Sequence, residues 1–288
     1  MKTNSLGLRG DEIDPQNSKN EFRILVLGDS ITWAGYLPEE ETYIFQLQRL
    51  LNQPAFKNIR TINAGIGDVG ITEEVGLLKE IYDSIKPKTV ILAFYLNDSR
   101  PPFGFESEKK LGWAKFLQKS RIINVIYNNV QVQLYLMRHK ILGENYRYRW
   151  LYLSKDAKWK YDKEYFKEMV KEADLDWGAA WDDSTWAIVK NQIEELNRFS
   201  NEKGIKFLIM CLPVSFQVYA EFLDDYPQEK LMDIARNKKI LYLDILPILR
   251  KNKNAELFYD HCHLNVQGQR IVAQELAEFI TANKIVSR

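Results

Sequence analysis

Short apolar runs alternate with amphipathic stretches along most of this 288-residue chain, and this alternation limits the folds open to it. Strand-like runs occupy residues 24–27, 59–64, 90–96, 205–212 and 240–243. Apolar side chains recur at helical spacing in residues 39–52, 73–86, 184–203 and 227–238 and in a stretch capped by Asn265. Alternating strands and helices predict an α/β domain with a parallel sheet covered on both faces.

The alternation is interrupted between residues 100 and 183. Six of the seven tryptophans lie in this stretch or just beyond it: Trp113, Trp150, Trp159, Trp177, Trp181 and Trp186. We predict a helical cap, inserted at 100–183 into a domain formed by 23–99 and 184–288, with an irregular arm at 1–22. Residues 119–141 predict a long helix with a broad apolar face. The tryptophans are expected to pack as core, with a carbohydrate- or acyl-binding surface as the alternative.

The composition excludes several classes of protein. Lys and Arg number 40 against 39 Asp and Glu, so the net charge of +1 does not favour binding to nucleic acid or an anionic membrane. Two cysteines, Cys211 and Cys262, form neither a disulfide framework nor a four-ligand zinc site. No apolar run reaches the roughly 20 residues of a membrane span. We expect a soluble chain; one trimmed of an N-terminal signal or anchor would have the same sequence, so export or anchoring stays open.

Polar residues with the chemistry of acyl transfer follow the predicted strands. Gly28, Asp29 and Ser30 come after the first strand, a glycine-rich loop after the second, and Asn97 after the third. Asp260 and His263 precede the last helix. Ligands bind where parallel strands end, so these segments are expected to meet at one edge of the sheet.

These residue types fit the roles of a serine nucleophile and its supports. The Ser30 hydroxyl needs a base, which His263 supplies, and Asp260 three residues earlier is placed to orient the imidazole. The oxyanion of a tetrahedral intermediate needs fixed donors. The candidates are the Ser30 amide, an amide of the 65–68 loop and the Asn97 side chain.

The chain resembles the SGNH hydrolases, also called GDSL esterases and lipases. Their four blocks are similar to Gly28-Asp29-Ser30, Asn63-Ala64-Gly65, Asn97-Asp98 and Asp260-x-x-His263, in this order. The resemblance implies a flavodoxin-like three-layer α/β/α fold with a five-stranded parallel sheet in the order 2-1-3-4-5, no metal and no cofactor. It also implies ester or acyl chemistry.

The sequence departs from the family pattern at two positions. Where the family has a glycine as an oxyanion donor, counting from Asn63 leads to Asp68, so either Asp68 or Gly67 provides the amide. Tyr95 stands where the family has another glycine, which we expect to narrow the pocket. Residues 4–10 of the arm resemble the segment before the first strand in membrane-anchored or exported bacterial members.

Competing interpretations remain for several residues. Asp29 is expected to hold the turn, Asp244 is a rival for the triad acid, and Asn97 is alternatively a loop cap. The segment His261-Cys262-His263 suggests a metal site but has too few ligands for one. His139 is expected at the surface.

The sequence therefore predicts a serine esterase or deacetylase acting on a small-molecule or carbohydrate ester. The alternatives are an O-acyltransferase for an envelope polysaccharide and a non-catalytic binding protein with the same fold. The oligomeric state stays open.

Overall fold

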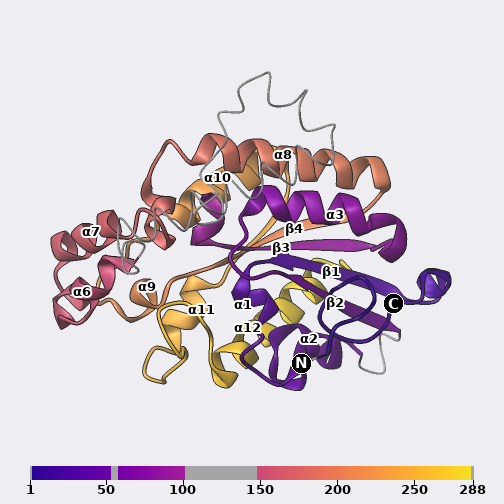
Figure 1. Ribbon diagram of the computed structural model, residues 1–288, viewed down its shortest axis with the longest axis horizontal. Coiled ribbons are helices and arrows are strands. Elements are labelled where there is room, and N and C mark those ends of the chain that lie inside the picture. The colour runs from indigo at the N-terminus through magenta and orange to yellow at the C-terminus, as the bar shows by residue number, and fades with distance from the viewer. Residues whose placement is uncertain (1, 53–57, 101–147, 287–288) are drawn as a thin grey trace, which may run out of the picture.

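A five-stranded parallel sheet forms the centre of the protein (Figure 1). The structure is a computed structural model that describes residues 2–52, 58–100 and 148–286. The strand order is β2-β1-β3-β4-β5, which confirms the predicted topology. The strands are β1 (Phe22–Gly28), β2 (Ile59–Gly65), β3 (Thr89–Tyr95), β4 (Lys206–Leu212) and β5 (Leu241–Asp244).

The register of the sheet brings the carboxyl ends of β1 and β2 level, and β3 continues two residues further. Gly28 of β1 lies opposite Gly65 of β2 and Ala93 of β3. The loops that follow these strands therefore start at one edge of the sheet. This edge is where the polar residues of the sequence motifs lie.

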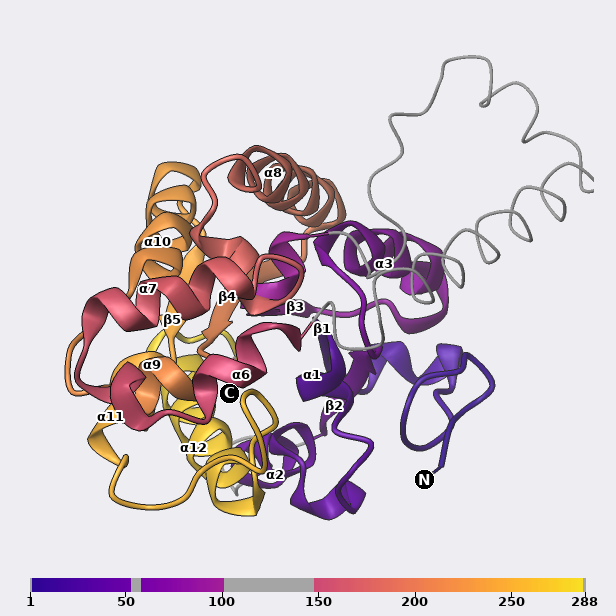
Figure 2. The same cartoon turned by 60° about the vertical axis from the view of Figure 1, so that its left-hand side comes forward.

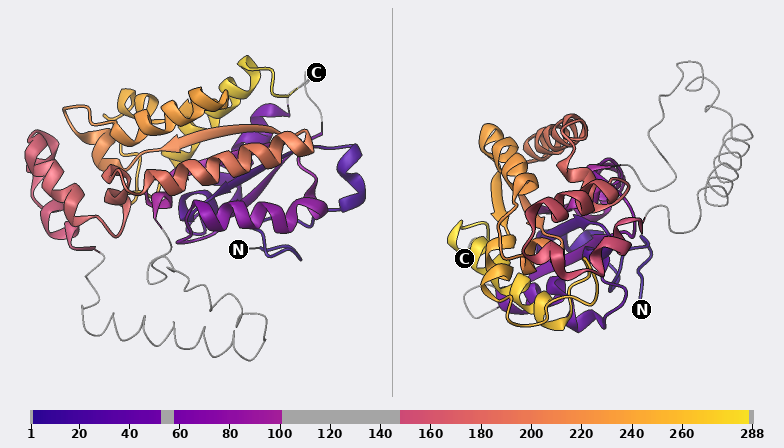
Figure 3. Two further views of the ribbon diagram at one scale, coloured as in Figure 1. Left: turned by 90° about the horizontal axis from the view of Figure 1, so that it is seen from above. Right: turned by 90° about the vertical axis from the view of Figure 1, so that its left-hand side faces the viewer.

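Helices cover both faces of the sheet, as Figures 1 and 3 show. One layer contains α2 (Tyr43–Leu51), α11 (Leu246–Lys251) and α12 (Val266–Ala282), and the other contains α3 (Ile71–Ile85), α8 (Trp186–Lys203) and α10 (Tyr226–Lys238). Each helix turns its apolar stripe toward the strands, as with Leu47, Leu78 and Leu276, which have no exposed surface. The three-layer α/β/α prediction is confirmed. The domain also contains these short elements: η1 (Pro15–Lys19), α1 (Ser30–Trp33), η2 (Glu39–Glu41), η3 (Leu96–Ser99) and α9 (Ser215–Tyr219).

Several predicted helices differ from the observed ones at their ends, and two of these differences have a clear local cause. The helix expected over 39–52 is divided, because Thr42 is extended and its hydroxyl caps α2 by accepting the Phe45 amide at 3.3 Å. The helix expected to reach residue 86 ends at Ile85. The ring of Pro87 disfavours α-helical geometry in the preceding residue, and Lys86 is instead the C-cap, with a left-handed φ of 48°.

Residues 148–183, the described part of the predicted insertion, contain short helices beyond the carboxyl ends of the strands (Figures 1 and 2). They are α6 (Trp150–Ser154), η5 (Ala157–Lys160), α7 (Lys163–Glu172) and η6 (Trp177–Trp181). The rings of Trp150 and Trp177 are buried, 5.8 Å apart, and both pack on Phe216. These tryptophans form core, as the sequence suggested. Trp113, His139 and the helix predicted over 119–141 lie outside the described residues.

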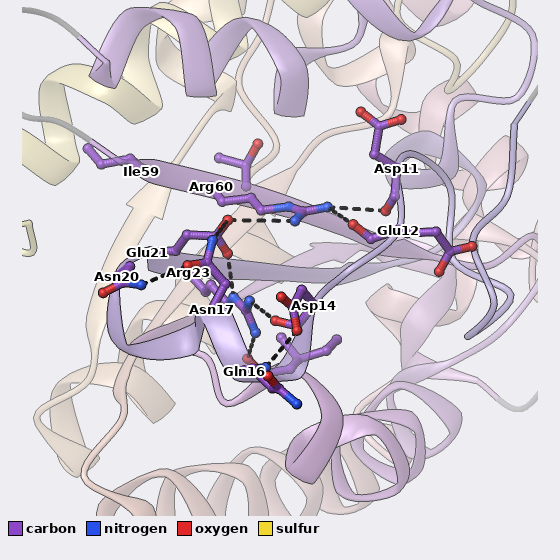
Figure 4. A network of polar contacts seen from close by, with 12 residues as sticks. Asp11, Glu12, Asp14, Gln16, Asn17, Asn20, Glu21, Arg23, Ile59 and Arg60 are labelled. Atoms are coloured by element: carbon purple, nitrogen blue, oxygen red, sulfur yellow. Dashed lines mark hydrogen bonds and ion pairs between the residues drawn. The ribbon is translucent and has the colours of Figure 1, made fainter.

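The N-terminal arm lies against the edge strand β2, where two arginines of the sheet bind it (Figure 4). Arg60 donates to the carbonyl oxygens of Asp11 and Glu12. Arg23, whose side chain is fully buried, donates to the carbonyl of Asp14 and to Glu21, and its other nitrogen donates to Ile85 at 2.8 Å. Apart from η1 the arm is irregular, yet its backbone is tied to β1 and β2. None of the helices in the described ranges is long and apolar enough to cross a bilayer.

Candidate active site

Ser30 begins the short helix α1 directly after β1. Asp29 caps this helix, because its Oδ1 accepts the backbone N–H of Ile31 at 2.9 Å, and its side chain is completely buried. Gly65 allows β2 to approach the same turn: a Cβ there would lie 2.2 Å from the Trp33 nitrogen. The Ser30 hydroxyl therefore lies at the sheet edge on a turn that is fixed by the Asp29 side chain and by the packing of Gly65 against it.

His263 lies across this edge, with its ring between Ser30 and Asp260. Its Nε2 is 3.1 Å from Ser30 Oγ, and its Nδ1 is 2.6 Å from Asp260 Oδ2. The other carboxylate oxygen of Asp260 accepts the backbone N–H groups of Cys262 and His263, both at 2.8 Å. Asn265 then caps α12 through the Gly268 amide. The structure thus brings together the three residues that the sequence nominated as a triad.

The charges of the site suit a base and its orienting acid. Burial acts to raise the pKa of Asp260, but hydrogen bonds from the ring and backbone of His263 outweigh it and hold this pKa well below its usual range. Burial acts to lower the pKa of His263, but the hydrogen bond and charge of Asp260 outweigh it, and the pKa of the imidazole is raised. A carboxylate that stays ionised beside a strengthened base is the arrangement that proton abstraction from Ser30 requires.

Asp29 has a different electrostatic character from Asp260. Burial raises the pKa of Asp29 to about 6, opposed by the Ile31 amide, the charge of His263 and a hydrogen bond from Asn97. Its Oδ2 is 3.5 Å from Ser30 Oγ, at the limit of a hydrogen bond. The role expected for Asp29, holding the turn, agrees with its contact to Ile31.

The predicted oxyanion donors Ser30, Gly67, Asp68 and Asn97 all line one cavity of about 650 Å³ with His263. Gly67 and Asp68 both remain candidates for the loop amide. Asp68 has a left-handed φ of 57°, and its carboxylate lies 3.3 Å from the guanidinium of Arg100. This ion pair offsets the negative charge that the side chain would otherwise bring near an oxyanion.

Several residues that line the cavity were not predicted from the sequence as site residues. Trp33 and Tyr36 come from the end of α1 and the loop after it, and Tyr148 and Asp176 come from the predicted insertion. Asp176 is 2% exposed and its Oδ2 lies 3.7 Å from His261 Nε2. No local pattern distinguishes these residues, because their partners lie far away in the sequence. Tyr95, predicted to narrow the pocket, is 1% exposed and lies in the cavity wall.

The two rival assignments, Asp244 as the triad acid and a metal at the histidine segment, fit the geometry less well. Asp244 Oδ1 accepts the backbone N–H of Leu246, the first residue of α11, at 2.9 Å, while the Nδ1 of His263 is bound by Asp260. Possible ligand atoms of Asp260, Cys262 and His263 lie within 4.8 Å of one another. Burial raises the pKa of the Cys262 thiol, which disfavours the thiolate that binds metals. This cluster therefore fits the triad better than a metal ion.

Comparisons with known proteins give similar structures but no sequence relatives. No family model matches the chain, and no curated protein matches it. The esterase EstA from Pseudoalteromonas is 14% identical, with a TM-score of 0.48 over 91% of this chain and 98% of its own. A variant of the acetylxylan esterase from Geobacillus stearothermophilus is 16% identical, with a TM-score of 0.48 over 90% of this chain and 93% of its own.

A third similar structure comes from Desulfitobacterium hafniense and is described as a lipolytic protein of the G-D-S-L family. It is 13% identical, with a TM-score of 0.42 over 90% of this chain and 99% of its own. At these identities the likeness is one of fold.

Proposed function

We propose that this protein is a serine-dependent hydrolase of carboxylic esters, with Ser30 as nucleophile, His263 as general base and acid, and Asp260 as the orienting carboxylate. The single observation that carries the proposal is the continuous path of contacts from Ser30 Oγ to His263 Nε2 at 3.1 Å and from His263 Nδ1 to Asp260 Oδ2 at 2.6 Å. A hydroxyl, an imidazole and a carboxylate in this order form the arrangement used in acyl transfer.

The reaction proceeds in two halves. His263 Nε2 takes the Ser30 proton as Oγ bonds to the acyl carbon, and donors from Ser30, the Gly67/Asp68 loop and Asn97 stabilise the oxyanion. His263 then gives the proton to the leaving alcohol as the ester bond breaks. In the second half a water molecule loses a proton to His263 and attacks the acyl carbon, and the proton returns to Ser30 as the carboxylic acid leaves.

We further propose that the substrate is a small-molecule or carbohydrate ester with a polar alcohol portion. The cavity wall combines the rings of Trp33, Tyr36 and Tyr148 with the carboxylate of Asp176, which accepts hydrogen bonds from hydroxyl groups. Tyr148 and Asp176 belong to residues 148–183, which supports a role for this described part of the predicted insertion in forming the substrate site.

Hydrolysis of short-chain nitrophenyl esters, together with labelling by a fluorophosphonate, tests the proposal. Wild type is expected to turn over and to be labelled on Ser30, and Ser30→Ala is expected to lose both properties. Ser184→Ala, a change at an exposed serine far from the triad in the sequence, provides the matched control. Equal rates of ester hydrolysis for wild type and Ser30→Ala would exclude the proposed serine-dependent hydrolase activity.

Two outcomes would favour the alternative functions. Turnover that rises strongly with an added sugar acceptor, with the acyl group recovered on that acceptor, would identify an O-acyltransferase. A folded wild-type protein that neither hydrolyses esters nor reacts with the fluorophosphonate would identify a binding protein.

A further inference from the structure

Residues 2–10 form a tight turn that presents one arginine toward the active-site side of the fold. Asn4 is buried, and its Oδ1 accepts the backbone N–H groups of Leu6 and Leu8, both at 3.0 Å. Gly7 and Gly10 have φ values of 78° and 116°, a region that favours glycine. Arg9 lies between them and pairs in a β-bridge with Asn63 of β2. The turn therefore fixes the direction of the Arg9 side chain.

The Arg9 guanidinium donates to backbone carbonyls at the end of α1 and in the loop that follows it. Its Nη1 donates to Trp33 at 2.8 Å and to Ala34, and its Nη2 donates to Leu37 at 2.6 Å. The residue is 6% exposed, so these charge-assisted bonds form away from water. A planar guanidinium reaches three carbonyls at once, which a lysine ammonium with its point charge does not reproduce.

This loop has a backbone conformation that needs support. Ala34 adopts a left-handed φ of 47°, a conformation that is unfavourable for a residue with a Cβ. Arg9 binds the carbonyl of this residue, of Trp33 before it and of Leu37 after it. The contacts of Arg9 therefore stabilise the one conformation of residues 33–37 that the cavity wall uses.

Tyr36 connects the loop to the histidine. Its ring lies 5.0 Å from the His263 ring at an interplanar angle of 65°, an edge contact. Its hydroxyl donates to the Leu264 carbonyl at 3.1 Å and accepts from Gln269 at 3.2 Å. Tyr36 is thus fixed at both ends, by Arg9 through the loop and by α12, and its ring limits the orientations open to His263.

From these contacts we propose that Arg9 is a positioning residue of the active site, which holds loop 33–37 and, through Tyr36, sets the orientation of the His263 imidazole. The proposal rests on the proposed function for its kinetic consequence but not for the contacts themselves. On this proposal the N-terminal arm supports the geometry of the active site through Arg9 and does not only cover the edge of the sheet.

Arg60 supplies the matched control, because it also joins the arm to the domain. Its guanidinium donates to the Asp11 and Glu12 carbonyls and pairs with Glu21 (Figure 4). Among the described residues, the side-chain hydrogen bonds and the ion pair of Arg60 all go to the arm and none goes to loop 33–37. Arg60→Gln removes an arm contact of the same chemistry without touching the loop. A general loosening of the arm would affect both variants alike.

The test compares Arg9→Gln, Arg9→Lys, Arg60→Gln, Tyr36→Leu and the Arg9→Gln/Tyr36→Leu pair in the full chain. We expect Arg9→Gln to lower kcat for a nitrophenyl ester by about 10- to 100-fold, since small displacements of catalytic groups have effects of this size. Arg9→Lys should be intermediate, and Arg60→Gln should keep the wild-type kcat. Because Arg9 acts through Tyr36, the double variant should be no slower than Tyr36→Leu alone.

A second readout separates this proposal from the proposed function. The downfield proton NMR resonance of the His263 Nδ1–H reports the ring geometry whether or not the protein hydrolyses esters. It should broaden or shift in Arg9→Gln and Tyr36→Leu, and stay unchanged in Arg60→Gln. If Arg9→Gln does not fold, Arg9→Lys decides by the same two readouts. Two outcomes would overturn the proposal. One is a wild-type resonance and kcat in the folded Arg9 variants. The other is a double variant whose fold-loss of kcat equals the product of the losses in Arg9→Gln and Tyr36→Leu.

Discussion

Asp260 binds His263 twice: its Oδ2 lies 2.6 Å from the ring Nδ1, and its Oδ1 accepts the backbone N–H of the same histidine at 2.8 Å. One carboxylate therefore fixes both the path of the chain and the tautomer of the ring. Both contacts lie within four residues of chain, whereas the distance from His263 to Ser30 depends on the tertiary fold.

Replacing Asp260 with Asn should remove the support for the correct tautomer while preserving shape. We expect kcat for a nitrophenyl ester to fall by a factor on the order of 10⁴, as for orienting carboxylates of other triads. Asp244→Asn is the matched control, because Asp244 was the rival acid and instead accepts the backbone N–H of Leu246. A large loss of kcat in Asp244→Asn, with little in Asp260→Asn, would reverse the assignment.

The acidic limb of the pH–activity profile should have its midpoint at a higher pH than the pKa of an ordinary histidine. His263 must be neutral to accept the Ser30 proton, and Asp260 raises the pKa of the imidazole above 6.5 despite burial. Activity should therefore be lost as pH falls through a midpoint above 6.5, measured as kcat/KM against pH. Asp260→Asn should move the residual activity to lower pH. An acidic midpoint at or below 6.5 in the wild type would contradict the electrostatic account.

Asn97 should act on the transition state more than on substrate binding. Removing one side-chain donor from an oxyanion site lowers kcat by about 10²- to 10³-fold, so Asn97→Ala should show this loss with little change in KM. Ser99→Ala is the control, since Ser99 lies in the same short helix and its hydroxyl donates locally, to the Leu96 carbonyl at 2.8 Å. A rise in KM without a loss of kcat would instead indicate a role in binding.

Glu74 should make the stability of the fold depend on pH. It is 2% exposed, and neither carboxyl oxygen has a hydrogen-bond partner among the described residues. Burial, with the charges of Asp29 and Glu73, raises its pKa well above 4.5. The folded state thus holds a proton that the unfolded state has lost above that value, and stability falls as pH rises toward the folded pKa, by up to about 1.4 kcal/mol per pH unit.

Urea unfolding of wild type and Glu74→Gln at a series of pH values checks this expectation. The neutral amide should flatten the dependence and raise the free energy of unfolding at neutral pH relative to wild type. Glu80→Gln, on the exposed side of the same helix, should leave the dependence unchanged. Parallel curves for Glu74→Gln and wild type would show that Glu74 titrates normally.

Much of the fold followed from local patterns. The apolar runs that form β1, β3 and β4 are buried on both faces of the sheet. Such strands can be predicted from the sequence alone, because burial on both faces requires a continuous run of apolar residues. The predicted helix ends were less accurate where a capping residue determines the end of the helix, as at Thr42 and Lys86. The predicted domain boundaries and the segment 101–147 stay predictions.

The proposed triad could be predicted from the sequence because Asp260 and His263 lie three residues apart and Ser30 closely follows a strand, so short spacings indicate their chemistry. Only the tertiary structure placed Ser30 within 3.1 Å of His263. It also revealed Arg9, Tyr36 and Asp176, whose partners are distant along the chain. Contacts of this kind depend on how the arm, the sheet edge and the inserted helices pack together, and packing between remote segments leaves no periodic or local pattern in the order of amino acids.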